Sequence, residues 1–141
     1  MPSSRNESQI TWSAASSITL NSSSRQDSDA VSFNVEDWEA AIQVSADNQG
    51  TPASGDHVDV YVKWTTGDVL GDSGDDYDTD EHAEYLGRLN TYSTNTPGED
   101  PARRTWQIPT SAKGFKLSVE APNAGSRNVV LRARLIAHRP Q

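Results

Sequence analysis

The sequence predicts an all-β protein, an antiparallel β-sandwich of jelly-roll or Greek-key (immunoglobulin-like) topology with an extended N-terminal arm. Two observations carry this prediction. Several segments alternate apolar and polar residues with a period of two, and clusters of turn-forming residues separate these segments. Side chains on a strand point to opposite faces in turn, so each segment has one face for the core and one for the outside. The order of the strands in the sheets cannot be read from this pattern.

The alternation is clearest in three segments, residues 37–46, 57–66 and 127–138. Between them, turn formers such as residues 47–52 end one strand before the next begins. The apolar residues that alternate along the predicted strands form the predicted core: Trp38, Ile42, Val44, Val60, Val62, Trp64, Phe115, Leu117, Leu131 and Leu135.

Shorter strands are expected along the rest of the chain, at residues 9–13, 17–21, 30–35, 83–92, 103–108 and 113–120. Of these, residues 83–92 also fit a short helix capped by Thr79 or Asp80. We favour the strand, in which Tyr85 and Leu89 lie on one face.

The chain has 141 residues, which predicts one domain, at 9–141, preceded by the polar arm of residues 1–8. The arm has no apolar periodicity, so we expect it to become ordered on another chain. It also lacks the apolar region of a signal peptide, and no stretch is long enough to span a membrane, so we expect synthesis in a cytoplasm. Cysteine is absent, which excludes disulfides and thiolate metal sites.

Charge is divided unevenly along the chain. The net charge is −8, yet residues 101–141 hold eight basic residues and one acidic residue. The two parts could neutralise each other within one fold or between copies. Because the overall charge repels phosphate, we expect no nucleic-acid partner.

Motifs that could carry catalysis are weak. Gly71-Asp72-Ser73-Gly74 is similar to the nucleophile loop of chymotrypsin-like proteases, but carboxylates crowd the serine and would oppose an oxyanion. His57, His82 and His138 show no zinc-binding spacing. We therefore expect no enzymatic activity and no cofactor.

Residues 67–81 form the densest acidic segment. Calcium takes six to eight oxygen ligands, which such a segment could supply, but the spacing does not match an EF-hand. An irregular calcium site, a solvated loop and an acidic patch that meets basic residues of another subunit all remain open. The third reading makes Asp75, Asp76 and Asp78 candidate interface residues.

The last strand places Arg132 and Arg134 on its outward face together with Val130 and Ile136. Arginine and apolar anchors are typical of protein interfaces. Three readings stand: an interface, a face covered by the chain's own loops, and plain exposure to solvent. We name Arg132, Arg134 and Ile136 as interface candidates, together with Ile10 and Trp12 next to the arm.

Four tryptophans could also form a platform on which a sugar stacks. Trp38, Trp64 and Trp106 are in phase with apolar neighbours, which favours the core, whereas Trp12 is less determined. A carbohydrate-binding module, with or without calcium, is therefore the alternative function, and an exposed row of aromatic side chains would favour it.

The chain resembles the small structural proteins of tailed bacteriophages, which are cysteine-free, rich in serine and threonine, and β-rich. The segments that carry the resemblance are Asp37-Trp38-Glu39-Ala40, residues 46–56, and the acidic run that leads into Tyr85-Leu86-Gly87-Arg88-Leu89. The subgroup that it resembles most is the capsid decoration, or cement, proteins.

The resemblance implies a virion protein without catalytic residues. Such a protein would bind the major capsid protein or another virion protein, as a trimer or dimer at a local symmetry axis. It would be made in the host cytoplasm and stabilised mainly in the assembly.

Overall fold

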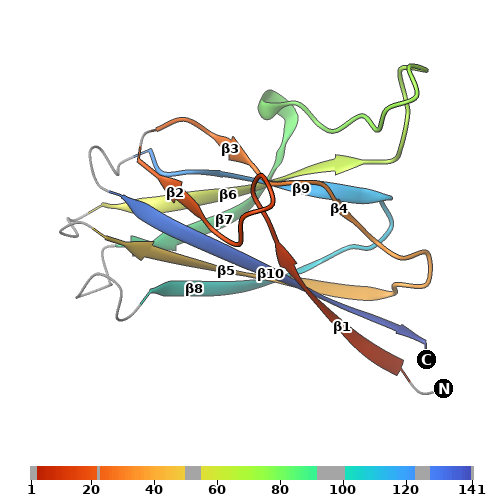
Figure 1. Ribbon diagram of the computed structural model, residues 1–141, viewed down its shortest axis with the longest axis horizontal. Coiled ribbons are helices and arrows are strands. Elements are labelled where there is room, and N and C mark those ends of the chain that lie inside the picture. Colours follow the sequence, from red (N-terminus) through yellow and green to blue (C-terminus); the bar gives the residue numbers. More distant parts are fainter. Residues whose placement is uncertain (1–2, 22, 50–54, 92–100, 123–127, 141) are drawn as a thin grey trace.

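The computed structural model describes residues 3–21, 23–49, 55–91, 101–122 and 128–140. One 3-10 turn, η1 (Asp80–His82), lies among the strands. Within the described residues, no helix has the length and apolar character needed to cross a membrane. The strands, in chain order (Figure 1), are β1 (Ser3–Ile10), β2 (Ile18–Leu20), β3 (Gln26–Asp27), β4 (Val31–Ser32), β5 (Glu39–Asn48), β6 (His57–Thr65), β7 (Glu84–Asn90), β8 (Ala102–Ile108), β9 (Gly114–Glu120) and β10 (Val129–Pro140).

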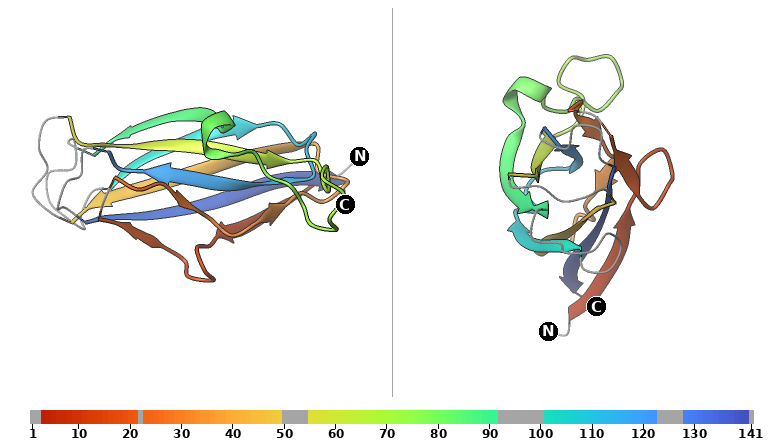
Figure 2. Two further views of the ribbon diagram at one scale, coloured as in Figure 1. Left: turned by 90° about the horizontal axis from the view of Figure 1, so that it is seen from above. Right: turned by 90° about the vertical axis from the view of Figure 1, so that its left-hand side faces the viewer.

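The strands form two antiparallel sheets that pack face to face, as Figure 2 shows. One, called here the β10 sheet, has the order β1-β10-β5-β8, and β2 also pairs with β10. The other, the β6 sheet, has the order β3-β9-β6-β7, and β4 also pairs with β9. The predicted all-β sandwich is confirmed.

The strands pair as if the whole chain were folded once into a long hairpin and the hairpin were then wrapped around the core. With β1 and β2 taken as one interrupted strand and β3 and β4 as another, strands pair from the two ends of the chain inward. The first pairs with β10, the second with β9, β5 with β8, and β6 with β7. This wrapped pairing defines a jelly roll, so the structure decides between the topologies that the sequence left open.

The core lies between the sheets and follows the predicted alternation. Of the ten predicted core residues, eight are buried: Ile42, Val44, Val60, Val62, Phe115, Leu117, Leu131 and Leu135. Alanines on β5 and β10 also belong to the core: Ala40, Ala46, Ala133 and Ala137 are all buried.

Two predicted core tryptophans lie elsewhere. Trp38 is 57% exposed, because it precedes β5 at the end of the sandwich, where its ring contacts His138 at a centroid distance of 5.8 Å. Trp64 is half-buried: its ring packs edge-on against Phe115, while its indole nitrogen donates to Glu84 at 2.7 Å. The polar indole nitrogen finds an acceptor at the sheet margin.

The outward face of β6 is covered, whereas the alternation predicted it to lie on the outside. His57, Asp59, Lys63 and Thr65 are buried on that side. The strand is central in its sheet, between β9 and β7, and Asp27 of β3 and Asp80 of η1 reach over its outward face to Lys63. A period of two shows which residues share a face, but not whether that face is covered.

The arm is the third correction. Residues 3–10 form β1, which pairs with β10 of the same chain from Ser3↔Pro140 to Ile10↔Ala133. We expected such a polar segment to need another chain. Backbone hydrogen bonds to a sheet edge require no apolar pattern, however, and the buried Ile10 anchors the end of the strand. Residues 84–90 form β7, which confirms a strand there, and the helical alternative is reduced to η1.

Candidate interaction surface

The outward side of the β10 sheet carries most of the sequence-predicted interface. The pairing register places Gln9 opposite Arg134, Arg134 opposite Gln43, and Gln43 opposite Thr105, so one row crosses four strands. We call this surface the arginine face. Its members are Arg5, Glu7, Gln9, Gln43, Ser45, Arg103, Thr105, Arg132, Arg134 and Ile136.

The predicted arginines of β10 are accessible. Arg132 and Arg134 are exposed and Ile136 is half-buried, so the chain's own described loops do not cover them. Among the described residues, Arg132, Arg134, Arg5 and Arg103 form no ion pair. The guanidinium groups therefore remain able to bind carboxylates in a bidentate way.

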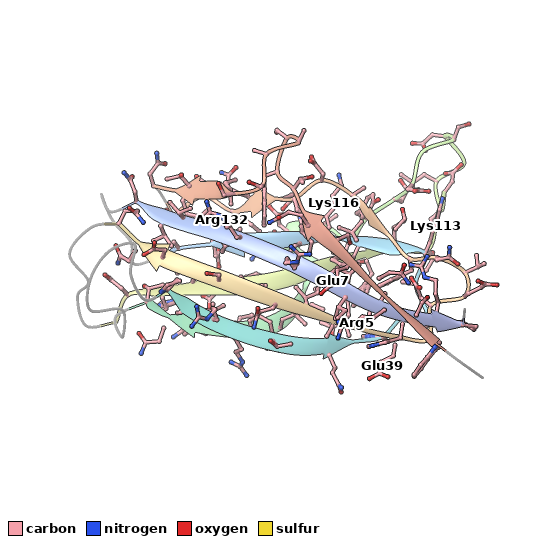
Figure 3. The ribbon with its side chains drawn as sticks, turned by 60° about the horizontal axis from the view of Figure 1, so that its bottom comes forward. Arg5, Glu7, Glu39, Lys113, Lys116 and Arg132 are labelled. Atoms are coloured by element: carbon pink, nitrogen blue, oxygen red, sulfur yellow. The ribbon has the colours of Figure 1, made fainter. Side chains whose placement is uncertain are left out.

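The face is shallow. One groove, of about 240 Å³, is lined by Glu7, Ala41, Gln43, Thr105, Arg134, Leu135 and Ile136. Another, of about 260 Å³, is lined by Gln9, Gln43, Ser45, Arg132, Ala133 and Arg134. Both are smaller than the ~300–1,000 Å³ of typical small-molecule sites. Figure 3 shows the labelled side chains of Arg5 and Glu7 on β1 and of Arg132 on β10 over this sheet.

The predicted acidic residues of the 67–81 loop act mainly within the chain. Asp75 forms an ion pair with Lys113 at 2.6 Å, Asp76 accepts two backbone N–H groups, and Asp78 accepts the backbone N–H of Trp64. Asp68 accepts hydrogen bonds from the backbone N–H groups of residues 71–73. These bonds, chiefly the one from Ser73, hold the pKa of Asp68 below its ordinary value. These carboxylates thus shape their own loop, and the reading in which the segment meets basic residues of another subunit stays a prediction.

Three of these carboxylates lie close together. Oxygens of Asp68, Asp72 and Asp76 are all within 4.8 Å of one another, which is the proximity a calcium site would need. Each of the three already accepts backbone N–H groups, Asp72 from Gly74 at 3.2 Å. The hydrogen bonds account for the conformation of the loop.

Ile10 and Trp12 are not surface anchors. Their exposed fractions are 1% and 4%, and both belong to the core of their own chain. The chain turns back directly after β1: Trp12 and Ala15 exchange two backbone hydrogen bonds of 2.9 Å. Asp29 fixes this turn by accepting from Thr11, Ser13 and Ala14.

A cluster that the sequence did not indicate covers the outward side of β6. Lys63 contacts Asp27 and Asp80, while Asp59 contacts Arg88, His57 and Tyr85. Burial of Lys63 acts to lower its pKa, but the hydrogen bonds with its two carboxylates outweigh this effect and raise it. In sequence these residues look like ordinary outward positions, and only the position of β6 in its sheet brings them together.

Exposed aromatic side chains do not form a row within the described residues. Trp38 and Tyr85 are 57% and 50% exposed and belong to different sheets, Trp38 beside β5 and Tyr85 on β7. Neither belongs to the arginine face. The part of the chain that the structure describes thus lacks the feature that would favour sugar stacking.

No protein-family model matches the chain, and no curated protein matches it. Solved structures of similar shape include a pilus protein of Bacillus endospore appendages, with 8% identity and a TM-score of 0.42, covering 99% of this chain and 89% of that one. A family 16 carbohydrate-binding module has 12% identity and a TM-score of 0.44, with coverage of 86% and 79%. A protein of infectious bursal disease virus has 10% identity and a TM-score of 0.41, with coverage of 96% and 36%.

Proposed function

We propose that this chain is a structural protein of a tailed-phage virion that binds the capsid lattice through the arginine face and stabilises or decorates it. The observation that carries the proposal is a set of exposed arginines on a shallow, four-stranded surface, none of which forms an ion pair within the described part of the chain. Arginine combined with apolar contact, as at Arg134 and Ile136, is what protein interfaces favour. The partner would be the major capsid protein or another virion protein that offers carboxylates.

The fold supports this proposal by analogy only. Jelly rolls occur in viral capsid proteins and in lectins, and a fold by itself does not define a function. The chemistry of the exposed surface therefore has to distinguish a capsid-binding role from a sugar-binding role. Among the described residues, the exposed aromatic side chain that adjoins the arginine face is Trp38, whose ring contacts His138 opposite Arg5. It stands at the end of the sandwich and forms no row with other exposed aromatic side chains, whereas the face offers several guanidinium groups, which favours a protein partner over a sugar. The two shallow grooves described on the arginine face suit a protein surface better than a small-molecule substrate.

The test is co-sedimentation with capsids. Purified chain is added to capsids from a phage of its own source that lacks the gene for this protein, and the mixture is sedimented through a sucrose gradient. We expect the natural chain to travel with the capsids. The double variant Arg132→Glu/Arg134→Glu should bind at least ~10-fold more weakly, because two interface charges are reversed.

The control is Lys113→Glu/Lys116→Glu, which changes the net charge by the same amount away from the arginine face (Figure 3). Because Lys113 pairs with Asp75 within the chain, far-UV circular dichroism has to show that this variant is folded before its binding is compared. We expect this control to bind like the natural chain. If the natural chain stays at the top of the gradient, or if both double variants bind equally, the proposal is wrong. Binding to a glycan array in place of capsids would support the carbohydrate-binding alternative.

A further inference from the structure

Strand β1 is a sheet edge with its outer side open. Within the described part of the chain it pairs with β10 and with no other strand. The pairing runs over eight residues without a shift in register. An open edge presents a row of backbone N–H and C=O groups to which another strand can bind.

The other described edges are very short or lie against one another. β3 and β4 have two residues each. β7 and β8 lie against each other: Arg104 donates to the backbone oxygen of Arg88, and a Cβ added at Gly87 would lie 3.1 Å from the ring of Trp106. By contrast, β1 contains no proline, lysine or bulge, which are three of the devices that protect an edge. Its only charged side chains are Arg5 and Glu7, one of each sign.

The charges on β1 are arranged symmetrically about Asn6. Arg5 and Glu7 are exposed on the same face, and neither forms an ion pair among the described residues. If a second β1 pairs antiparallel with the first across a two-fold axis at Asn6, Arg5 of each copy lies opposite Glu7 of the other. Opposite charges that face each other across strands stabilise the pair, and like charges destabilise it.

We propose that β1 pairs with β1 of a second copy of this chain, in antiparallel register about Asn6, and joins the two β10 sheets into one. Opposed residues of paired strands point to the same side, so the arginine faces of both copies would lie on one side of the joined sheet. The interface is isologous, as a two-fold dimer requires. The inference rests on β1 itself and stands whether or not the virion role does.

The first test uses the absence of cysteine from the chain. In the proposed register the two Asn6 positions face each other, with Cα atoms ~4.5–5.5 Å apart, within the range that a disulfide spans. Asn6→Cys should therefore form a disulfide-linked dimer under mild oxidation. Ser4→Cys and Ser8→Cys should not, because each is ~14 Å from its own copy.

A mixture of the two serine variants is the positive control, since Ser4 of one copy faces Ser8 of the other. It should give the mixed dimer, and each serine variant by itself should stay monomeric on a non-reducing gel. Far-UV circular dichroism confirms that each variant is folded. If folded Asn6→Cys links no faster than the two serine variants, the register is wrong and the proposal fails.

The second test swaps charges in the natural, cysteine-free background. Arg5→Glu and Glu7→Arg each place like charges opposite one another, and we expect the dimer Kd from sedimentation equilibrium to weaken at least ~10-fold. An equal mixture of the two variants restores opposite charges at both positions and should recover the natural Kd. If the natural chain remains monomeric up to about 1 mM, or if the mixture recovers nothing, β1 does not pair as proposed.

Discussion

The ammonium nitrogen of Lys63 lies 2.6 Å from a carboxylate oxygen of Asp27 across the outward face of β6. Lys63 also contacts Asp80 of η1, so one lysine links β3, β6 and the turn before β7. The lysine side chain is 8% exposed, whereas those of Asp27 and Asp80 are 37% and 68% exposed. Burial therefore desolvates the ammonium group of Lys63 much more than the two carboxylates.

This difference in exposure predicts that loss of the carboxylates destabilises the fold more than loss of the lysine. Asp27→Asn combined with Asp80→Asn leaves a buried ammonium without a countercharge, which should lower the free energy of unfolding by about 3–5 kcal/mol. Lys63→Met removes the buried charge and leaves carboxylates that water can screen, at a cost of about 1 kcal/mol. Urea unfolding measures both values, and a larger loss for Lys63→Met than for the double variant would contradict this account.

The turn after β1 offers a stabilising substitution. Ser13 and Ala14 have φ angles of 47° and 67°, a left-handed conformation that costs residues with a Cβ roughly 1–2 kcal/mol. Hydrogen bonds to Asp29 hold the turn in this conformation. Ala14→Gly relieves the strain and should raise the free energy of unfolding by up to ~1 kcal/mol.

The control for that substitution is the neighbouring Ala15→Gly. Ala15 is not among the residues with positive φ, so glycine there only adds freedom to the unfolded chain. We expect it to be neutral or destabilising by ~0.5–1 kcal/mol. Thermal unfolding measures both variants. If Ala14→Gly and Ala15→Gly change the stability by the same amount, the backbone at Ala14 is not strained.

Adjacent residues on β10 should respond oppositely to truncation. Leu131 is fully buried and Arg132 is exposed on the arginine face. Leu131→Ala should cost ~2–5 kcal/mol because it leaves a cavity between the sheets. Arg132→Ala should change the free energy of unfolding by no more than ~0.5 kcal/mol. Chemical denaturation of both variants tests the inward and outward assignment, which a loss of stability at Arg132 comparable to that at Leu131 would overturn.

Acid should weaken the fold through a few identified carboxylates. Backbone N–H groups lower the pKa of Asp29, chiefly that of Ala14, and of Asp68, chiefly that of Ser73, while Lys63 lowers that of Asp80. Each folded-state pKa lies below the ordinary value of 3.8. The stabilisation from these groups is therefore present above about pH 4 and is lost as the pH falls through the lowered pKa values.

The measurement is the urea midpoint between pH 7 and pH 2. Asp29→Asn should be less stable than the natural chain at pH 7 and should lose less stability on acidification, because one titrating contact is gone. Ser111→Ala, an exposed position that does not titrate, is the control and should keep the slope of the natural chain. An unchanged slope in Asp29→Asn would remove Asp29 from the acid response.

The sequence determined the fold class and most of the strands, because side-chain alternation is a local property of extended backbone. Val60 and Val62 could be assigned to the core in this way, and Arg132 and Arg134 to the outside. Only the tertiary structure decided the order of strands, and with it whether an outward face is exposed. β6 is central and covered, so Lys63 is buried and its more exposed carboxylates reach over it, whereas the outward face of β10 carries arginines that form no ion pair among the described residues. It also decided that β1 lies on β10 as an edge, because backbone hydrogen bonds between residues more than a hundred positions apart leave no periodic signal in the side chains.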